Sequence, residues 1–291
     1  MDHLPDPPTR LIGLVLTDSA ARVGVEPFFI ELIAGLDEVL APTGSSVLLL
    51  VVPDLAAESA TYRRWAAEGT VAAVVVVNLV HDDVRPALLE ALGLPAVLAG
   101  HYAGPAALPS VVTDDAVAMN AAVRLLADLG HRVVGRVSGP AQLVHTAERT
   151  LAARQAGQHL GVDVRVAEAD YSAAAGMRAA RALLAETPAP TAIMFDNDVM
   201  AVATEQDLVR SGIRVPAQVS LLACNDSALC ELAVPPLSAL SIDVHEHGVT
   251  LARVVLDVLA GAPTRAHPGP PISIHRRAST GPACRSPGDL A

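Results

Sequence analysis

The stretch "TAIMFDNDVMAVATEQDLVRSGIRVPAQVSLLACND", residues 191–226, contains one complete strand–helix–strand repeat. An apolar run ends at Asp196, and a helix-like segment follows until Gly212 and Pro216 stop it. A second apolar run ends at Asn225. Because neither apolar run has a polar face, both strands are expected in a parallel sheet that helices cover on both sides. This repeat predicts an α/β fold.

The same alternation of short apolar runs and Ala/Leu-rich amphipathic segments continues outward, and a loop at 103–115 divides it into two series of similar size. In the first series we expect strands at 10–18, 45–54, 71–80 and 94–102 and helices at 27–44, 56–69 and 82–93. In the second we expect strands at 132–139, 162–170, 191–197 and 219–226 and helices at 115–130, 145–161, 172–187 and 198–211. A strand-like crossing with a helix at 237–261 and a final strand at 270–280 follow. The pattern predicts two doubly wound parallel-sheet lobes with a cleft between them, and ligands of such sheets bind beyond the carboxyl ends of the strands.

Composition limits the classes of function. The 291 residues are 52% hydrophobic and carry a formal net charge of -11, which disfavours direct binding of nucleic acid by this chain. The ten-residue apolar run at 71–80 is well short of the roughly 18 residues that a membrane span needs. No secretion signal opens the chain, and the three cysteines have no metal-type spacing. We therefore expect a cytoplasmic protein with reduced thiols and no membrane partner.

Signatures of enzymes and of cofactor sites are missing from the sequence. It contains no G-x-G-x-x-G, P-loop, nucleophile-elbow or H-E-x-x-H motif. The nearest cluster of metal-ligand types is "DVHEHG" at 243–248, at the start of an expected helix where Asp and Glu are ordinary first-turn residues. We accordingly expect no catalytic residues, no metal and no cofactor.

Polar side chains close two neighbouring strands of the second series. Asp196, Asn197 and Asp198 follow one strand, and Asn225 and Asp226 follow the next. Asp198 is well placed to cap the helix that starts there, which is the purely structural reading. Capping does not account for Asn197 or for the second pair. The sequence therefore predicts a polar ligand site at this edge, with Asp198 as the helix cap and Asn197 facing the ligand.

Two further side chains have both a structural and a functional reading. Arg149 lies early in an expected helix, where an arginine is usually solvated, but near a strand end it can instead fork onto two acceptors of a ligand. Tyr171 follows the strand at 162–170, and its ring either packs in the core or forms a platform for a sugar ring or a base.

Several motifs occur in the same order as in a known protein family. "LGHRVVGRVSGP", "ERTLAARQAGQHLG", "NDVMA" with "GIRVPAQVS", "PPLSAL" and "HRRAST" resemble the effector-binding core of the lactose-repressor/galactose-repressor (LacI/GalR) family, over about residues 10–280. The resemblance implies a type I periplasmic-binding-protein-like fold with three crossovers near Val112, Ser238 and 266–272. It implies lobes at 10–112 plus 239–268 and at 113–238 plus 269–281. We expect residues 1–9 and 282–291 to be disordered.

The resemblance also assigns site residues. Arg149, Asn197 and Asn225 match family residues that hydrogen-bond the ligand, and Tyr171 matches the stacking aromatic of the second lobe. First-lobe loops would close on the ligand from the other side, and their expected contributors are Ser19, Asn78 and His101. Asn225 stands where relatives usually carry an aspartate. A hexose is therefore a less secure expectation, and another sugar, a nucleoside or a different small polar metabolite remains open.

The beginning of the sequence departs from the family. Family regulators carry an N-terminal helix-turn-helix that reads DNA, whereas only "MDHLPDPPTR", with three prolines, precedes the first strand. We therefore expect a small-molecule sensing core that acts on DNA only through a helix-turn-helix head absent from this chain. The family likeness implies a homodimer that uses the first lobe and the helix at 27–42. The alternative is a stand-alone binding protein without a DNA role.

Overall fold

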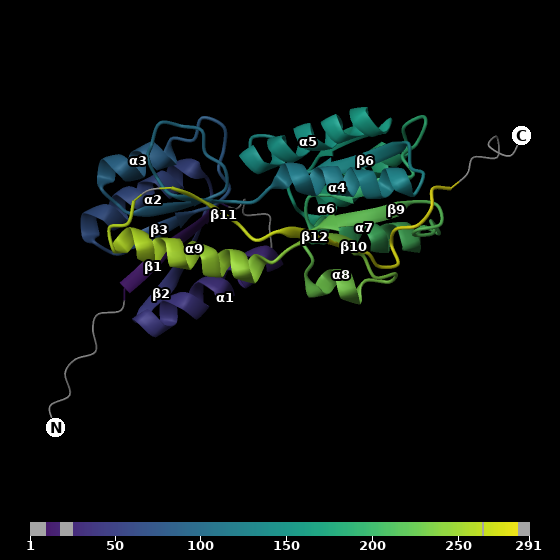
Figure 1. Ribbon diagram of the computed structural model, residues 1–291. Helices are drawn as coiled ribbons and strands as arrows, with labels where there is room; N and C mark the ends of the chain where they lie inside the picture. Colours follow the sequence, from purple (N-terminus) through teal and green to yellow (C-terminus); the bar gives the residue numbers. More distant parts are fainter. Residues whose placement is uncertain (1–9, 18–25, 264, 285–291) are drawn as a thin grey trace, which may run out of the picture. The chain divides into compact units, whose positions relative to one another are not determined.

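The computed structural model describes residues 10–17, 26–263 and 265–284. The described chain divides into two compact units, drawn in Figure 1. The first unit extends to Thr113 and takes in Asp243–Pro270, and the second contains Asp114–Ile242 and the described residues from Pro271 onward. The chain thus changes unit three times, and each unit is built around its own sheet.

The sheet of the first unit is parallel throughout, with strand order β11-β5-β4-β3-β1-β2. Its strands are β1 (Arg10–Thr17), β2 (Ser45–Val52), β3 (Ala73–Val76), β4 (Ala96–Ala99), β5 (Ser110–Val112) and β11 (Ala266–Pro268). Its helices are α1 (Pro27–Leu40), α2 (Leu55–Glu68), α3 (Arg85–Leu92) and α9 (Val244–Leu259), with a 3-10 turn η1 (Ala41–Thr43) after α1.

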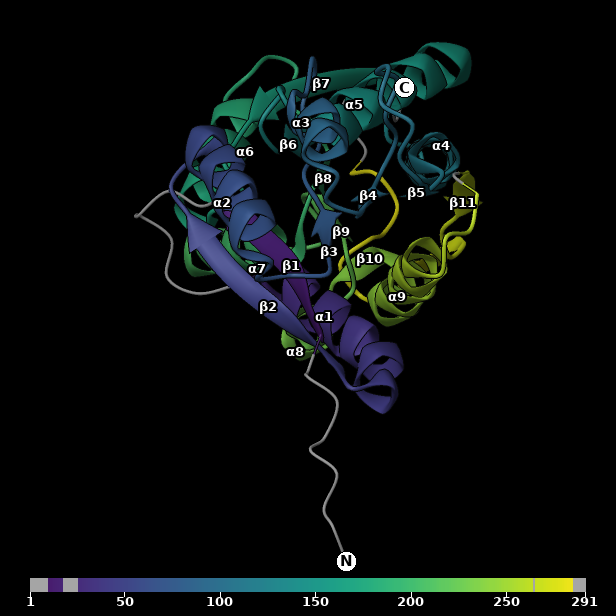
Figure 2. The same cartoon turned by 90° about the vertical axis from the view of Figure 1, so that its left-hand side faces the viewer.

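Helices α1 and α9 pack closely on one face of this sheet, as Figure 2 shows. Two glycines permit the approach, because a Cβ on Gly35 would collide with the carbonyl of His245 and a Cβ on Gly248 would collide with that of Leu32. Leu32 and Leu36 of α1 and Leu251 and Val255 of α9 are fully buried here. The two helices therefore form one wall of the apolar core of the first unit.

The sheet of the second unit has the order β12-β10-β9-β8-β6-β7, with every pair parallel except β10 and β12. Its strands are β6 (Val133–Ser138), β7 (Asp163–Glu168), β8 (Ala192–Phe195), β9 (Ser220–Cys224), β10 (Ser238–Ile242) and β12 (Ile272–His275). Its helices are α4 (Asp115–Asp128), α5 (Val144–Leu160), α6 (Ala173–Leu184), α7 (Asp198–Arg210) and α8 (Ala228–Leu232).

Both faces of this second sheet are covered. Along β8, Ile193 and Phe195 belong to one buried apolar cluster, whereas Ala192 and Met194 belong to the cluster on the opposite face. A strand buried on both faces explains why its sequence is apolar at every position. The predicted α/β fold, with two doubly wound sheets, is confirmed.

Strand β10 corrects one assignment made from sequence. The sequence analysis places residues 239–242 in the first lobe, but β10 pairs with β9 and β12 of the second sheet, with Leu240 opposite Cys224 and Ile274. The apolar run at 238–242 is suited to either sheet, so composition alone does not decide its pairing. The expectation of disorder from residue 282 onward is also wrong for the first residues of that segment. The amide of Ala283 donates a hydrogen bond to the carbonyl of Leu129. The expected disorder at 1–9 and 285–291 lies outside the described residues.

Candidate functional site

The carboxyl ends of four parallel strands meet at one edge of the second sheet. Strands β9, β8, β6 and β7 are neighbours in that order, and each is followed by a polar or glycine-containing turn. In doubly wound sheets this edge is where ligands bind, because helix N-termini and loop side chains converge there. The loops after these strands and the first turns of α4 and α5 supply the residues that follow.

Arg149 lies on α5 and forms an ion pair with Asp115, the first residue of α4. The distance from Arg149 Nε to Asp115 Oδ1 is 2.6 Å, and the two side chains are 18% and 8% exposed. Burial alone would lower the pKa of Arg149, but Asp115 and the other acidic groups around it together outweigh burial and hold that pKa above its usual value. The guanidinium is therefore charged, fixed in place and partly open to a ligand.

Tyr171 follows β7 and packs against the start of α5. Its hydroxyl lies 2.9 Å from Nε2 of His145 and 3.0 Å from the hydroxyl of Thr146. The rings of Tyr171 and His145 are stacked, with centroids 6.5 Å apart. The ring also lies over Gly139, where any Cβ would collide with it. Tyr171 has a left-handed backbone with φ of 67°, which a tyrosine seldom adopts. The ring is thus held in a defined orientation.

His145 contributes a neutral imidazole to this group. Burial, aided by the positive charge of Arg149, lowers the pKa of His145 to about 4. The ring is consequently uncharged at neutral pH, with one nitrogen as donor and the other as acceptor. The sequence analysis does not single out His145, because nothing in its local sequence distinguishes it from a solvated helical histidine.

Beneath these residues lies a fully buried ion pair between β6 and the end of β8. Nη2 of Arg136 is 2.8 Å from Oδ1 and 2.9 Å from Oδ2 of Asp196, and both side chains are 0% exposed. The same Oδ2 accepts the amide of Gly139 at 2.8 Å. Asp196 therefore holds the turn after β6 in place, and it does so from below the surface.

Asn197 takes the capping role that the sequence pattern assigns to Asp198. Asn197 is the N-cap of α7, with its side-chain oxygen accepting the amide of Met200 at 2.9 Å, and Asp198 is already helical. The side-chain nitrogen of Asn197 donates to the carbonyl of Tyr171 at 3.1 Å. The prediction that Asp198 is the cap is wrong. The extended backbone at Asn197 begins the helix one residue earlier than expected.

Asn225 and Asp226, which follow β9, differ in their contacts. Asn225 adopts a left-handed backbone with φ of 68°. Asp226 instead faces Arg277, whose Nη1 and Nη2 donate to its two oxygens at 2.6 and 2.9 Å. Burial raises the pKa of Asp226, but the hydrogen bonds and charges of Arg277 and His275 together outweigh that effect and hold the pKa below its usual value. Asp226 therefore anchors the C-terminal segment.

Two of the predicted first-lobe residues, Asn78 and His101, lie just after strands of the first unit. Asn78 follows β3 in a left-handed conformation with φ of 51°, and its carbonyl accepts Nη2 of Arg85 at 2.9 Å. His101 is exposed just after β4. Ser19 lies outside the described residues.

Of the predicted residues in the second unit, Arg149 and Tyr171 meet at the first turns of α5, and Asn197 supports the Tyr171 loop. The partners Asp115, His145 and Arg136 are missed by the sequence analysis. Asp115 had one available signal, since it follows β5 at the start of a helix. Arg136 had none, because a charged residue within an apolar strand does not identify its partner.

The "DVHEHG" segment at 243–248 behaves as a helix start. The side chain of Asp243 caps α9 by accepting the amide of Glu246 at 2.9 Å. Within the described ranges, no group of three or more His, Cys, Asp or Glu side chains has the arrangement of a metal site. Among the same residues, no helix has the length and apolar character of a membrane span.

Comparison with known proteins identifies the family to which this architecture belongs. Residues 123–280 match the family described as periplasmic binding protein-like domain. The HTH-type transcriptional regulator CelR of Thermobifida fusca is 28% identical over 261 residues, which cover 88% of this chain and 76% of the regulator. A LacI family transcriptional regulator from Bifidobacterium animalis has a TM-score of 0.85 and 34% identity, over 94% of this chain and 99% of that one. A solved complex of CelR with cellobiose has a TM-score of 0.84 and 26% identity, over 94% and 86% of the two chains. The chain therefore belongs to the periplasmic-binding-protein-like family, and its relatives within that family are LacI-type transcriptional regulators.

Proposed function

We propose that this chain is the effector-sensing core of a cytoplasmic LacI-type transcription regulator, and that the effector is an uncharged, polyhydroxylated small molecule, with a sugar as the first candidate. The observation that carries the proposal is the ion pair between Arg149 and Asp115 at the carboxyl edge of the second sheet. An arginine that is already neutralised offers directed N–H donors without an excess of positive charge.

The charges around the candidate site support an uncharged effector. Asp115 pairs with Arg149, Asp196 with Arg136 and Asp226 with Arg277. Burial of an ionised ligand beside compensated pairs is unfavourable, because the ligand charge would have no partner of its own. Hydroxyl groups, which both donate and accept, suit such a surface.

The aromatic surface formed by Tyr171 and His145 agrees with a sugar. The apolar C–H face of a pyranose packs on a ring while its hydroxyls reach neighbouring donors and acceptors. His145 remains neutral at physiological pH because burial lowers its pKa to about 4. Asn225 then supplies an amide, which both donates and accepts. Asn78 and His101 remain proposed effector ligands of the first unit.

Relatives lend further support. CelR of Thermobifida fusca is a transcriptional regulator, and a solved CelR is complexed with cellobiose. By this likeness we propose that the effector alters binding to DNA allosterically. Contact with DNA then requires a helix-turn-helix, which residues 10–17, 26–263 and 265–284 do not contain.

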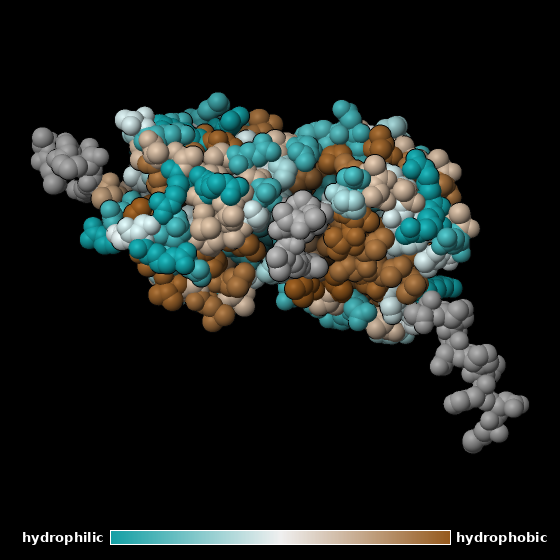
Figure 3. Space-filling view, turned by 180° about the vertical axis from the view of Figure 1, so that it is seen from behind, coloured by the Kyte–Doolittle hydropathy of each residue, from teal (hydrophilic) through white to brown (hydrophobic). Residues whose placement is uncertain are grey.

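We further propose a homodimer that uses the first unit. Figure 3 shows hydrophobic side chains gathered on the surface of that unit, on the side of β2 and α1. Val51 of the edge strand β2 is 50% exposed and Ile30 of α1 is 57% exposed. Large apolar side chains beside an unpaired strand edge favour association with another chain.

The direct test is a binding screen with matched pairs of ligands. Cellobiose, glucose and a nucleoside are compared by calorimetry with glucuronate and glucose 6-phosphate, which add a negative charge to a similar ring. We expect a neutral sugar or nucleoside to bind and its anionic counterpart to bind far more weakly. Tighter binding of the anionic members would overturn the assignment of an uncharged effector.

The site is tested by Arg149→Ala with Arg154→Ala as a matched control. Arg154 is exposed on the same helix, so its loss removes an equal charge away from the site. We expect effector affinity to fall by roughly a hundredfold in Arg149→Ala, which corresponds to the loss of charge-assisted hydrogen bonds. Equal affinities in the two variants would place the effector elsewhere.

A further inference from the structure

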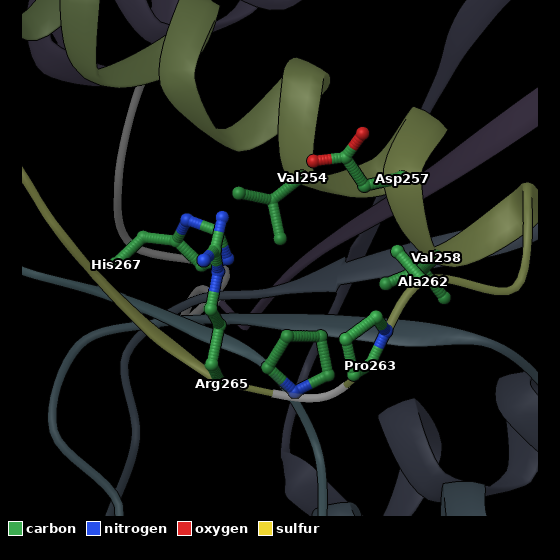
Figure 4. Close-up of a pocket in the computed structure, with 8 residues that line it drawn as sticks. Val254, Asp257, Val258, Ala262, Pro263, Arg265 and His267 are labelled. Carbon is green, nitrogen blue, oxygen red and sulfur yellow. The ribbon is translucent and has the colours of Figure 1, made fainter.

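A hollow lies in the first unit, away from the carboxyl ends of its strands. It has a volume of about 280 Å³ and opens between the last turns of α9 and the edge strand β11. Figure 4 shows the side chains that line it, with Asp257 on the helix and Arg265 and His267 on the segment that forms β11. The described function makes no use of these residues.

The floor of the hollow is apolar. Val254 and Pro109 are buried, and Val258 is half-buried beside them. A hollow of this size with an apolar floor takes a small aliphatic group in preference to a sugar ring, which would leave its hydroxyls unpaired against these side chains. The floor therefore selects for a short hydrocarbon side chain.

The rim carries opposite charges on opposite sides. Arg265 immediately precedes β11 and His267 lies within it, and Figure 4 shows both side chains on one side of the hollow, while Asp257 comes from α9. Within the described part of the chain, no hydrogen bond or ion pair engages the side chains of these three residues. A guanidinium and a carboxylate thus border one small hollow without neutralising each other.

The helix end adds to this polarity. The carboxyl end of a helix carries partial negative charge, which a basic residue in the last turn commonly balances. The last turn of α9 has no basic residue, and it contributes Asp257 instead. The α9 side of the hollow thus attracts a cation, whereas the β11 side attracts an anion.

We propose that this hollow binds a small zwitterion with an aliphatic side chain, namely an aliphatic L-α-amino acid. The carboxylate of the amino acid would accept hydrogen bonds from Arg265 and His267. Its ammonium group would pair with Asp257 at the end of α9, and its side chain would lie on Val254 and Pro109. A ligand with both charges satisfies both sides of the rim, whereas a simple anion would face Asp257 unpaired.

This site is independent of the proposed effector site, and the experiment separates the two. Binding of L-leucine is measured by calorimetry beside L-leucinamide, which lacks the carboxylate, and N-acetyl-L-leucine, which lacks the ammonium group. Arg265→Gln and Asp257→Asn are compared with Arg253→Gln, an exposed arginine of α9 that pairs with Glu246 outside the hollow. Arg149→Ala reports on binding at the effector site.

We expect L-leucine to bind, with each analogue and each of the two rim variants weaker by at least about tenfold. Arg253→Gln and Arg149→Ala should bind L-leucine like the wild-type protein. The proposal is overturned if none of leucine, isoleucine and valine binds, or if both rim variants bind normally. It is also overturned if Arg149→Ala abolishes binding, since the amino acid would then occupy the effector site.

Discussion

The guanidinium Nε of Arg149 lies 2.6 Å from Oδ1 of Asp115, so one ion pair joins α5 to the start of α4 at the proposed effector site. Asp115 is 7% exposed as a residue, and Arg149 is its partner. Without Arg149, the largely buried carboxylate of Asp115 would lose the cation that pairs with it. Arg149 therefore has a structural role as well as its proposed role in binding.

The first prediction separates these two roles. Arg149→Ala should lower the free energy of unfolding by roughly 1–3 kcal/mol, because it leaves Asp115 partly buried without its cation. Adding Asp115→Asn should recover part of that loss, since the uncompensated charge is removed, but it should not recover effector affinity. Urea denaturation measures the first effect and calorimetry the second. Full recovery of affinity in the double variant would contradict a direct contact between Arg149 and the effector.

The second prediction concerns the buried pair below the site. Arg136→Met should destabilise the protein by about 3–5 kcal/mol, because it removes one partner of a fully buried ion pair and leaves Asp196 buried without its cation. Arg165→Met is the control, since Arg165 pairs with the exposed Asp163 at 2.8 Å and its loss should leave stability nearly unchanged. Equal midpoints of urea unfolding in the two variants would show that the buried pair is not a main support of the site.

The fold was accessible from sequence because its strands are apolar at every position and short helical segments separate them. The expected strand at 10–18 and the expected helix at 27–44 correspond to β1 and α1, with ends that differ by a few residues. Strand β10 was assigned incorrectly, since pairing with β9 depends on tertiary contacts that an apolar run does not encode.

The site was accessible in part. The polar residues at the strand ends indicate Asn197 and Asn225 as site residues, and the family resemblance indicates Arg149 and Tyr171. A shift of one residue in the helix start was enough to make Asn197, and not Asp198, the N-cap of α7. Arg136 escaped notice because the pairing of residues sixty positions apart is fixed by strand order, with β6 beside β8.

Asn225 carries the third prediction. Its φ of 68° is tolerated by glycine and strained for alanine. Asn225→Ala should therefore lose about 1 kcal/mol of stability, and Asn225→Gly much less. Both variants lose the amide, so effector affinity should fall equally in the two. Thermal unfolding and calorimetry on both variants provide the test. If effector affinity falls in Asn225→Ala but not in Asn225→Gly, Asn225 acts through its backbone conformation and not through its amide.

The proposed dimer leads to the fourth prediction. Val51→Lys places a charge on the exposed edge strand β2, and it should weaken dimerisation by at least about tenfold. Val84→Lys is a suitable control, because Val84 is 69% exposed at the start of α3, outside the proposed surface. Sedimentation velocity over a range of concentrations gives the dissociation constants. A wild-type protein that stays monomeric, or a Val51→Lys dimer of unchanged strength, would refute this surface.

Glu205 on α7 leads to the fifth prediction, because it is a fully buried acid. It is 0% exposed, and among the described residues neither of its carboxylate oxygens has a hydrogen-bond partner. Burial raises its pKa from the ordinary 4.5 to about 7. The folded protein thus holds a proton on Glu205 at a pH where the unfolded chain has already released it.

The sign of the pH effect follows from this difference. Below the ordinary pKa of 4.5, Glu205 is protonated in both states and costs no charge burial. As the pH rises from 4.5 to about 7, the unfolded chain loses the proton first, so stability falls with increasing pH. Above about pH 7 the stability loses nothing further, because Glu205 is then ionised in both the folded and the unfolded state.

Glu205→Gln removes this titration while keeping the shape of the side chain. The variant should be more stable than the wild-type protein above the folded pKa by roughly 2–3 kcal/mol, and the advantage should shrink toward acidic pH. Glu68→Gln, which changes an exposed glutamate of α2, should show no such pH-dependent difference. Urea unfolding of the three proteins across the acidic to neutral range gives the measurement. A constant difference between Glu205→Gln and the wild-type protein at every pH would mean that Glu205 has an ordinary pKa in the folded state.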